Sequence, residues 1–397
     1  MTLNTNARYT FLIKAFFIVL LLELFLLGSG QFLSFGGLSL RMVFYSIAIS
    51  SSVILLLRGI KIAKKVFLFL LVYISMLSFS SYLGIINGAD STQISENLKP
   101  LLFAFMILPF SMFITNISRV VLVGKLIKLS GLIMGVSFIS VLLLLFFGYM
   151  DFSTIYILLS SDSNDFMMND GENIHIFYKG FLYLNIAFIF YIYSNDKYKL
   201  LILSLLFIAI LLTFTRGFIL ALILSFVLVF ILEYKQKKSI IALTFIVTVT
   251  LITIPFYISF VGDKSESDFM RILQIQQVFD AITLSSFFMG HGYGIGVPIR
   301  PNGMEITFLE IFHKQGILGL FLWIGFLFYI IYNYLNIKNI TYKRVVKPFV
   351  VSTFFVYMQS LTNPYLNNPI GMSMVLLTFS ALIVVAYKER KERFIKC

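Results

Sequence analysis

Residues 200–232 read LLILSLLFIAILLTFTRGFILALILSFVLVFIL, and this stretch decides the fold. Its one ionisable residue is Arg216. A helix needs about 20 apolar residues to cross a bilayer core, so the stretch predicts two spans joined by a tight turn at Arg216. A charge at such a turn is either an arginine snorkelling to the interface or a functional group, and the cost of placing it there favours function.

The composition of the whole chain agrees with this interpretation. Of the 397 residues 59% are hydrophobic and 12% are charged, whereas a soluble domain carries about 25% charged residues. These figures exclude a soluble enzyme, a disordered chain and a disulfide scaffold, and the single Cys397 excludes an intrachain disulfide. We therefore expect an all-α polytopic membrane protein.

Further apolar stretches of similar length extend the pattern along the chain. About twelve spans are predicted, and the whole chain, 1–397, then forms one transmembrane domain. The spans are expected at 9–30, 37–57, 66–87, 98–116, 124–148, 176–194, 198–215, 216–233, 239–261, 316–336, 346–363 and 369–387.

The net charge of +13 follows the predicted spans. With the N-terminus inside, every inner connection is basic, as the positive-inside rule requires, and both termini are expected to be cytoplasmic. The basic residues are scattered over many loops without interleaved aromatic residues, so no nucleic-acid surface is indicated. The Lys and Arg residues on the outer side are Arg41, Lys99, Lys179, Arg216, Lys264, Arg271, Arg300 and Lys314. Glu23 lies inside the first span, where we expect it to face a polar cavity.

Two outer connections are long enough to be functional. The first, 149–175, is acidic but lacks the spacing of a calcium loop, so we expect a solvated loop. The second, 262–315, is the candidate catalytic loop. It contains Arg271, an amphipathic helix over 272–282, a segment that reads MGHGYGIG at 289–296, and a polar-headed helix that reads EITFLEIFHKQGILG at 305–319.

The order of these features resembles the O-antigen polymerase and O-antigen ligase superfamily of bacterial envelope polysaccharide assembly. The shared features are Thr215-Arg216-Gly217 on a hairpin of spans, an outer loop that opens with an arginine, the glycine-alternating segment and the polar-headed helix. The resemblance covers residues 211–325 most specifically. Ligases commonly open that helix with a His-Asn pair, whereas this chain has Met304 and Glu305, which favours a polymerase.

The resemblance implies a glycosyltransferase of the bacterial plasma membrane that uses a polyprenyl-diphosphate-linked oligosaccharide. Its partners would be this lipid-linked substrate, membrane lipid, and chain-length regulator and flippase proteins, with no nucleic acid. Such a reaction needs positive charge on the leaving diphosphate and requires no cofactor or metal. The alternatives are a ligase that uses another acceptor and, in a different class, a lipid-linked oligosaccharide flippase. A flippase would show an internal repeat and polar residues near the midplane of its spans.

The resemblance also suggests roles for individual residues. Arginine binds phosphate oxygens through a planar fork, so the expected diphosphate ligands are Arg216, Arg271 and Arg300. The acceptor hydroxyl needs a base, for which the candidates are Glu305, His313 and His291. Ordinary explanations remain for each: Arg271 could pair with Glu266 or Asp268, and Glu305 could be a helix-dipole acid. A backbone that approaches the glycan closely would use Gly292, Tyr293, Gly294 and Gly296.

Overall fold

The computed structural model describes residues 7–28, 34–35, 38–160, 166–169, 175–233 and 265–396. The first half of the described chain contains α1 (Ala7–Leu26), β1 (Ser34–Phe35), β2 (Leu38–Ser39), α2 (Leu40–Leu57), α3 (Lys64–Ile86), α4 (Ser91–Leu101), the 3-10 helix η1 (Leu102–Met106), α5 (Ile107–Phe113), α6 (Ile117–Phe146), α7 (Phe152–Ser160), β3 (Phe166–Asn169) and β4 (His175–Tyr178). The second half contains α8 (Phe181–Ile192), α9 (Lys199–Leu212), α10 (Arg216–Glu233), α12 (Ser265–Asp280), α13 (Leu284–Met289), α14 (Thr307–Leu335), α15 (Ile340–Gln359) and α16 (Pro369–Lys396).

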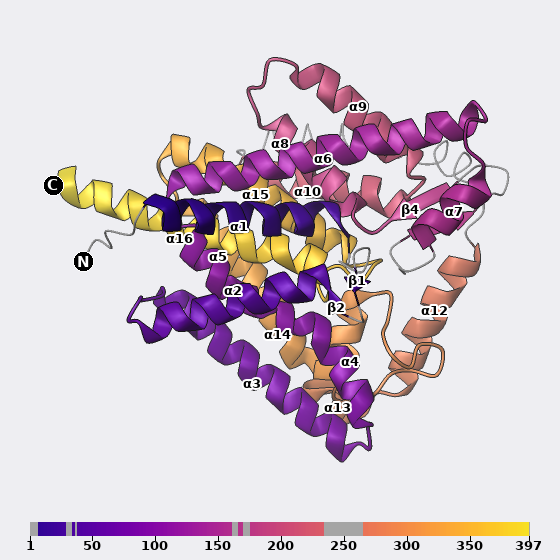
Figure 1. Cartoon of the computed structure of the whole chain (residues 1–397). Helices are drawn as coiled ribbons and strands as arrows, with labels where there is room; N and C mark the ends of the chain where they lie inside the picture. Colours follow the sequence, from indigo (N-terminus) through magenta and orange to yellow (C-terminus); the bar gives the residue numbers. More distant parts are fainter. Residues whose placement is uncertain are drawn as a thin grey trace.

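The described chain is a bundle of helices with two short antiparallel strand pairs, β1–β2 and β3–β4 (Figure 1). A helix lies at each predicted span except 239–261, which falls outside the described residues. Helical stretches long and apolar enough to cross a membrane are Leu40–Leu57, Lys64–Ile86, Ser91–Phe113, Ile117–Phe146, Thr307–Leu335 and Pro369–Arg393. An integral membrane protein built mainly of helices is therefore confirmed, whereas twelve spans stay a prediction.

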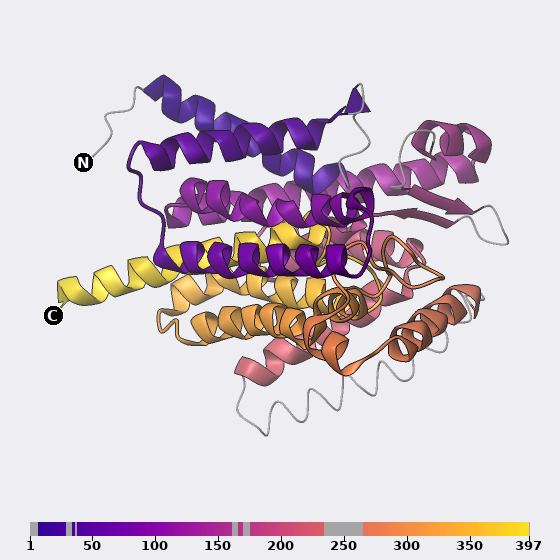
Figure 2. The same cartoon turned by 90° about the horizontal axis from the view of Figure 1, so that it is seen from below.

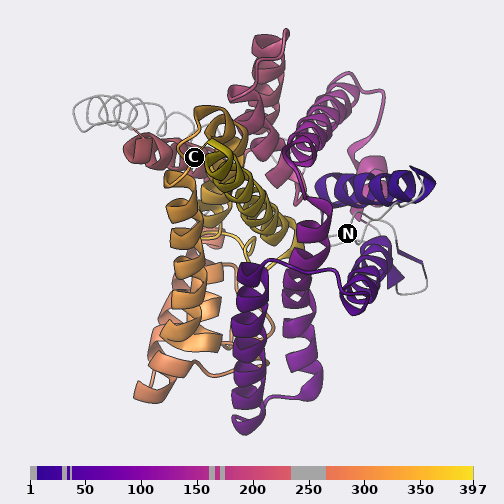
Figure 3. The same ribbon diagram turned by 90° about the vertical axis from the view of Figure 1, so that its left-hand side faces the viewer.

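Helix α16 forms the centre of the bundle. Its apolar side chains are almost all buried, among them Met374, Leu377 and Val385. Seen from the end, α16 lies between α14 and α15 on one side and the N-terminal helices on the other (Figure 3). By contrast, large apolar side chains on the outer helices, such as Phe67 and Phe328, are exposed. Exposed apolar side chains in this number fit a lipid-facing surface.

Small residues bring two helices of the bundle into close contact. A Cβ atom on Gly131 of α6 would lie 2.1 Å from the Cβ of Ala187 on α8. Glycine at such a position lets two backbones approach each other, which is how membrane helices gain packing energy without a hydrophobic effect between them.

The two ends of the bundle differ. The start of α1 and the end of α16 lie at one end, together with the connection between α2 and α3 (Figures 1 and 2). Helices α7, α12 and α13 lie at the opposite end. Part of the predicted solvated loop 149–175 has regular structure, because α7, β3 and the start of β4 fall within it. Both predicted long connections thus contribute to the same end.

Glu23 has an explanation that the sequence did not supply. Its carboxylate accepts hydrogen bonds from Arg41 Nε at 3.1 and 3.3 Å, and both side chains are buried. The pair joins α1 to α2 beside a small void lined by Glu23 and Arg41 together with apolar side chains. The polar environment expected for Glu23 is therefore an arginine of the next helix.

Candidate functional site

Helix α12 positions the loop that carries two of the predicted site residues. Gln277 Oε1 accepts a hydrogen bond from the backbone N–H of Ile299 at 3.0 Å, and Gln274 Oε1 accepts one from that of Glu305, also at 3.0 Å. Gln274 is fully buried, so its bond to the loop is shielded from water. The loop is thereby fixed on both sides of Arg300.

The glycine-alternating segment packs backbone to backbone against α3. Gly292 has a φ of +89°, and a Cβ there would lie 2.0 Å from the backbone N of Gly84. The backbone N–H of Tyr293 donates to Ser80 O at 2.9 Å. Gly294 and Gly296 are enclosed in the same way, by Ile94 of α4 and by Pro301. The glycines therefore allow close packing of protein against protein, and their contact with a glycan stays a prediction.

The start of α14 is bound to the turn between α15 and α16. The backbone N–H of Thr307 donates to Ser360 O at 3.1 Å, and its hydroxyl donates to Asn363 O at 3.0 Å. Farther along, Gly316 interrupts the helix with a φ of +63°. A Cβ at Gly316 would lie 2.3 Å from the carbonyl oxygen of Phe288, so glycine alone admits α13 this close.

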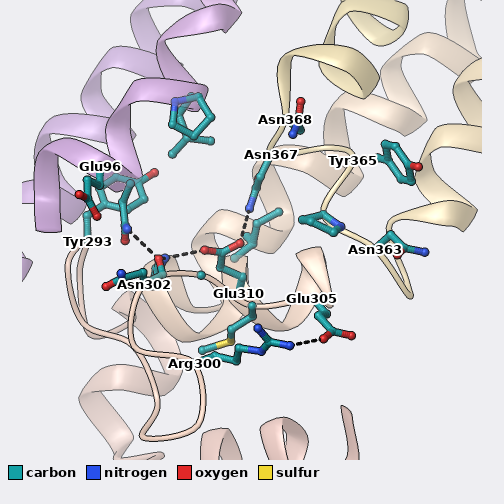
Figure 4. A pocket seen from close by; sticks show the side chains of 18 of the residues that line it. Glu96, Tyr293, Arg300, Asn302, Glu305, Glu310, Asn363, Tyr365, Asn367 and Asn368 are labelled. Atoms are coloured by element: carbon teal, nitrogen blue, oxygen red, sulfur yellow. Dashed lines mark hydrogen bonds and ion pairs between the residues drawn. The ribbon is translucent and has the colours of Figure 1, made fainter. Parts of the chain in front are cut away.

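These elements enclose a cavity of about 720 Å³ (Figure 4). Its walls come from α4, the segment after β4, α12, the loop 290–306, α14 and the turn between α15 and α16. The polar and charged side chains on the walls belong to Glu96, Asn97, Lys179, Arg271, Tyr293, Arg300, Asn302, Glu305, Glu310, Lys314, Gln315, Asn363, Tyr365, Asn367 and Asn368. A volume of this size is within the range of pockets that bind small molecules.

Two arginines meet one carboxylate in this cavity. Arg271 Nε lies 3.2 Å from Glu305 Oε2, and Arg300 Nη2 lies 2.5 Å from Glu305 Oε1. Arg271 also contacts Asp268 at 3.0 Å, which confirms the pairing considered from the sequence. The guanidinium groups thus converge on a single anion, and the anion in place is a side chain of the protein. We call these three residues the arginine cluster: Arg271, Arg300 and Glu305.

A second polar cluster contains Glu310, which Figure 4 shows, together with Lys314. Lys314 Nζ lies 2.5 Å from Glu310 Oε1 and 3.4 Å from Asn302 O. Asn367 Nδ2 donates to Glu310 Oε2 at 3.3 Å. The Glu310 side chain is 12% exposed and that of Lys314 is 4% exposed. A spacing of four residues on a helix is typical of a surface pair, whereas the structure buries this pair in the cavity wall.

Other predicted site residues lie near the cavity without lining it. Arg216 begins α10, and the adjacent Gly217 lies against Gln359 and Thr362 at the end of α15. The ring centroid of Phe218 lies 6.1 Å from that of Phe177 and 6.4 Å from that of Tyr365. Both Phe177 and Tyr365 line the cavity. Arg216 is thus two residues from Phe218, which packs against the cavity wall, but Arg216 is not among the described residues that line the cavity.

The two histidines form a separate unit beside the cavity. Their rings stack with centroids 4.4 Å apart, and the backbone N–H of His291 donates to His313 O at 2.8 Å. His313 is 3% exposed. Neither imidazole is part of the cavity wall. Among the described residues no group of three or more His, Cys, Asp or Glu side chains could hold a metal ion, and a metal-independent reaction stays a prediction.

The segment Asn363-Pro364-Tyr365-Leu366-Asn367-Asn368 belongs to the site, although it was not predicted from the sequence. It places three amide side chains on the cavity wall. Its signal was available, because several asparagines and two prolines interrupt two long apolar stretches at this point. Asn97 of α4 carried no such signal, since it lies in an ordinary amphipathic helix.

The chain is similar in sequence to known proteins. Residues 201–324 match a family described as O-antigen ligase. A protein of Shigella flexneri named O-antigen polymerase is 28% identical over 374 residues, which cover 91% of this chain and 92% of the relative. The two matches support the O-antigen polymerase and O-antigen ligase superfamily as the family of the chain. No solved structure gives a significant match.

The superfamily match coincides with the elements of the site. Residues 201–324 contain most of α9, all of α10, α12 and α13, the loop 290–306 and the first half of α14. The arginine cluster and the Glu310–Lys314 pair both fall inside this range. By contrast, the amides of α4 and of the α15–α16 turn fall outside it.

Proposed function

We propose that the protein is a polysaccharide polymerase that joins polyprenyl-diphosphate-linked oligosaccharide repeat units. The observation that carries this proposal is the cavity in which Arg271 and Arg300 converge on one anion. The relative named O-antigen polymerase, which matches over most of the chain, supports the same reaction class. The reaction transfers the growing glycan from its lipid diphosphate to a hydroxyl of the next unit.

The two arginines would bind the diphosphate of the donor. A guanidinium group stays charged and binds phosphate oxygens in a bidentate manner, so it stabilises the negative charge that develops on the leaving group. The Glu305 carboxylate holds this position in the structure. Arg216 is the third candidate ligand, and its place beside the cavity wall makes it a contact for the more distant phosphate or the lipid end.

The acceptor hydroxyl loses its proton during transfer and needs a base. The sequence predicts Glu305 for this role, with His313 and His291 as alternates. Glu305 lies on the cavity wall and the histidines do not, so the structure favours a carboxylate.

The cavity is proposed to open on the external face of the plasma membrane. The supporting pattern is that Arg58 and Lys61, in the connection between α2 and α3, and Lys64, at the start of α3, lie at the end opposite to α12 and α13. Basic connections lie on the cytoplasmic side in bacterial membrane proteins. A flippase that delivers the lipid-linked units and a chain-length regulator are then the expected partners.

Reconstitution tests the proposal. Purified protein in vesicles, given lipid-linked repeat units, should produce glycans of several units, and Arg271→Ala should abolish them without lowering the protein level. Wild-type vesicles that make no longer glycan would reject a polymerase. Transfer to a different lipid acceptor would instead establish the ligase, which the family match to O-antigen ligase keeps as the second candidate. Movement of intact units between leaflets, without new linkages, would establish a flippase.

A further inference from the structure

The cavity has a wall rich in amide groups that the diphosphate does not explain. Asn97, Asn302, Asn363, Asn367 and Asn368 reach it from three separate parts of the chain. Amide side chains both donate and accept hydrogen bonds, and they carry no charge. A wall of this composition matches the hydroxyl groups of a sugar better than it matches phosphate.

Three buried polar atoms on the same walls have no hydrogen-bond partner among the described residues. They are Asn367 Oδ1, Gln315 Oε1 and the hydroxyl of Tyr365. Buried polar groups are nearly always paired, by protein, water or ligand. A ligand with hydroxyl groups would therefore gain hydrogen bonds from these atoms.

Glu310 lies among these groups and is costly to bury. The attraction within a buried ion pair seldom exceeds the free energy lost when the two charges leave water. An ionisable pair at the start of a membrane helix therefore indicates a functional role. Lys314 and Asn367 each engage one oxygen of Glu310, which fixes the orientation of the carboxylate. A carboxylate offers about four lone-pair positions, so each oxygen keeps one position for a further donor.

Glu305 is placed differently. Both of its oxygens face guanidinium groups, at the positions where the leaving diphosphate would bind. In an in-line displacement the attacking hydroxyl approaches the anomeric carbon from the side opposite to the leaving group. The base is then expected away from the arginines. Glu310 meets this condition, because within the described residues its carboxylate is bound by the amide of Asn367 and by Lys314 and not by a guanidinium group.

We propose that the amide wall is the acceptor-sugar subsite and that Glu310 is the base that acts on the acceptor hydroxyl. The inference rests on the proposed polymerase function. In the step, the hydroxyl proton passes to Glu310 and the hydroxyl oxygen bonds to the anomeric carbon of the donor. The bond from that carbon to the diphosphate oxygen breaks, and the electron pair leaves with the polyprenyl diphosphate.

Besides Glu310 itself, charged groups line the cavity from every wall element except the turn between α15 and α16, which contributes amide side chains. They are Glu96 of α4, Lys179 after β4, Arg271 of α12, Arg300 and Glu305 of the loop, and Lys314 on the same helix. Lys314 is in direct contact with Glu310. Removing the Glu310 carboxylate should therefore change the pH dependence of transfer more than removing any other acid in the cavity.

Binding measurements can distinguish the amide wall of the cavity from the arginine cluster. The probes are inorganic pyrophosphate and the free oligosaccharide released by mild acid from the lipid-linked repeat unit of the host cell. Asn367→Ala should weaken binding of the oligosaccharide about tenfold, the loss of one or two hydrogen bonds, and leave pyrophosphate binding unchanged. Arg271→Lys should show the opposite pattern. Wild-type oligosaccharide affinity in Asn367→Ala would overturn the subsite.

Kinetics tests the base. Single-turnover transfer is measured against pH for Glu310→Gln, for Glu305→Gln and for Asp280→Asn, a matched change at an exposed position outside the cavity. Glu310→Gln should slow transfer by about 10²–10⁴-fold and remove the acidic limb of the profile, whereas Asp280→Asn should match the wild type. Because Glu310→Gln leaves the Lys314 ammonium unpaired, the double variant Glu310→Gln/Lys314→Met is measured as well.

Each result has a separate meaning. An acidic limb that persists in Glu310→Gln and in the double variant, and disappears in Glu305→Gln, would assign the base to Glu305 and overturn the inference while the polymerase stands. Oligosaccharide binding that depends on Asn367, in a protein that makes no polymer, would support the subsite and reject the proposed reaction.

Discussion

Arg271 and Arg300 share a carboxylate but differ in their other contacts. Arg271 also pairs with Asp268, whereas within the described part of the chain Arg300 pairs with Glu305 alone. Lysine keeps the charge but loses the planar fork that matches phosphate oxygens. We therefore expect Arg271→Lys and Arg300→Lys each to lower kcat/KM for the lipid-linked donor by about tenfold or more. Wild-type kinetics in both variants would show that point charge alone is sufficient.

Glu305→Gln should have an unusual effect on binding. The variant keeps the size of the side chain but removes the internal anion from the two arginines. Pyrophosphate would then no longer compete with a carboxylate, and its affinity should rise, as measured by isothermal titration calorimetry. A lower affinity would mean that Glu305 shapes the arginine site and does not compete for it.

The residues of the cavity were predictable to different degrees. Arg271, Arg300 and Glu305 stand out because they are ionisable groups in a long outer loop of a chain with few charges. Glu310 and Lys314 did not stand out, because a spacing of four residues on a helix is typical of a surface ion pair. Their burial depends on Asn302 and Asn367, which no local pattern connects to them.

At the scale of elements, the break in α14 at Gly316 lies directly after the site residues Glu310 and Lys314. Gly316→Ala would force a Cβ into the backbone of Phe288 and a positive φ on an alanine, so we expect a lower melting temperature and loss of polymer. Gly325 lies on the same helix with nothing within 4 Å of its Cβ position. Gly325→Ala is the matched control and should be as stable as the wild type or slightly more stable. Equal melting temperatures for the two variants would contradict this account of the break.

The Glu23–Arg41 pair joins α1 to α2 in the interior. Glu23→Ala would leave a buried guanidinium without its carboxylate, at a cost of about 3–5 kcal/mol. The double variant Glu23→Leu/Arg41→Met should recover most of the lost thermal stability, because no charge then remains unpaired. Thermal unfolding in detergent measures both. A double variant less stable than Glu23→Ala would show that the pair does more than compensate charge.

Elements were predicted well where hydrophobicity alone defines them. A helix lies at every predicted span within the described residues, because an apolar stretch of that length has few alternatives in a bilayer. The polar-headed helix predicted over 305–319 is also present, since α14 begins at Thr307 and runs into the predicted span. Its start is anchored to Ser360 and Asn363 through Thr307. The break at Gly316, by contrast, was not predicted.

At the scale of the whole molecule, the orientation can be tested directly. The start of α1 and the end of α16 lie at the same end of the bundle (Figure 2). We expect a reporter that is active only in the cytoplasm to be active when fused after residue 396, and a reporter active only outside to be inactive there. The same pair of reporters inserted after Asp280 should give the opposite result. External activity at the C-terminal fusion would reverse the proposed orientation.

The cavity as a whole lay beyond sequence reasoning. Its walls bring together α4, α12, the start of α14 and the turn before α16, which are separated by as many as about 270 positions in the chain. Composition and hydropathy report how each segment meets lipid or water, but they carry no information on which loops meet one another. The charge pattern nevertheless indicated which loops to consider. The few basic residues predicted on the outer, acidic side of the membrane include both arginines of the cavity, Arg271 and Arg300.

The position of Glu305 has a consequence for turnover. A tethered carboxylate stays near the arginines throughout the cycle, at an effective concentration on the order of millimolar. After transfer it can return to Arg271 and Arg300 and displace the spent polyprenyl carrier, so tight capture of the donor need not make release slow. The two arginines would then be free to bind a new carrier after every transfer. This favours growth by repeated exchange of carriers. The length of the product would be set by competition between release of the chain and binding of the next donor.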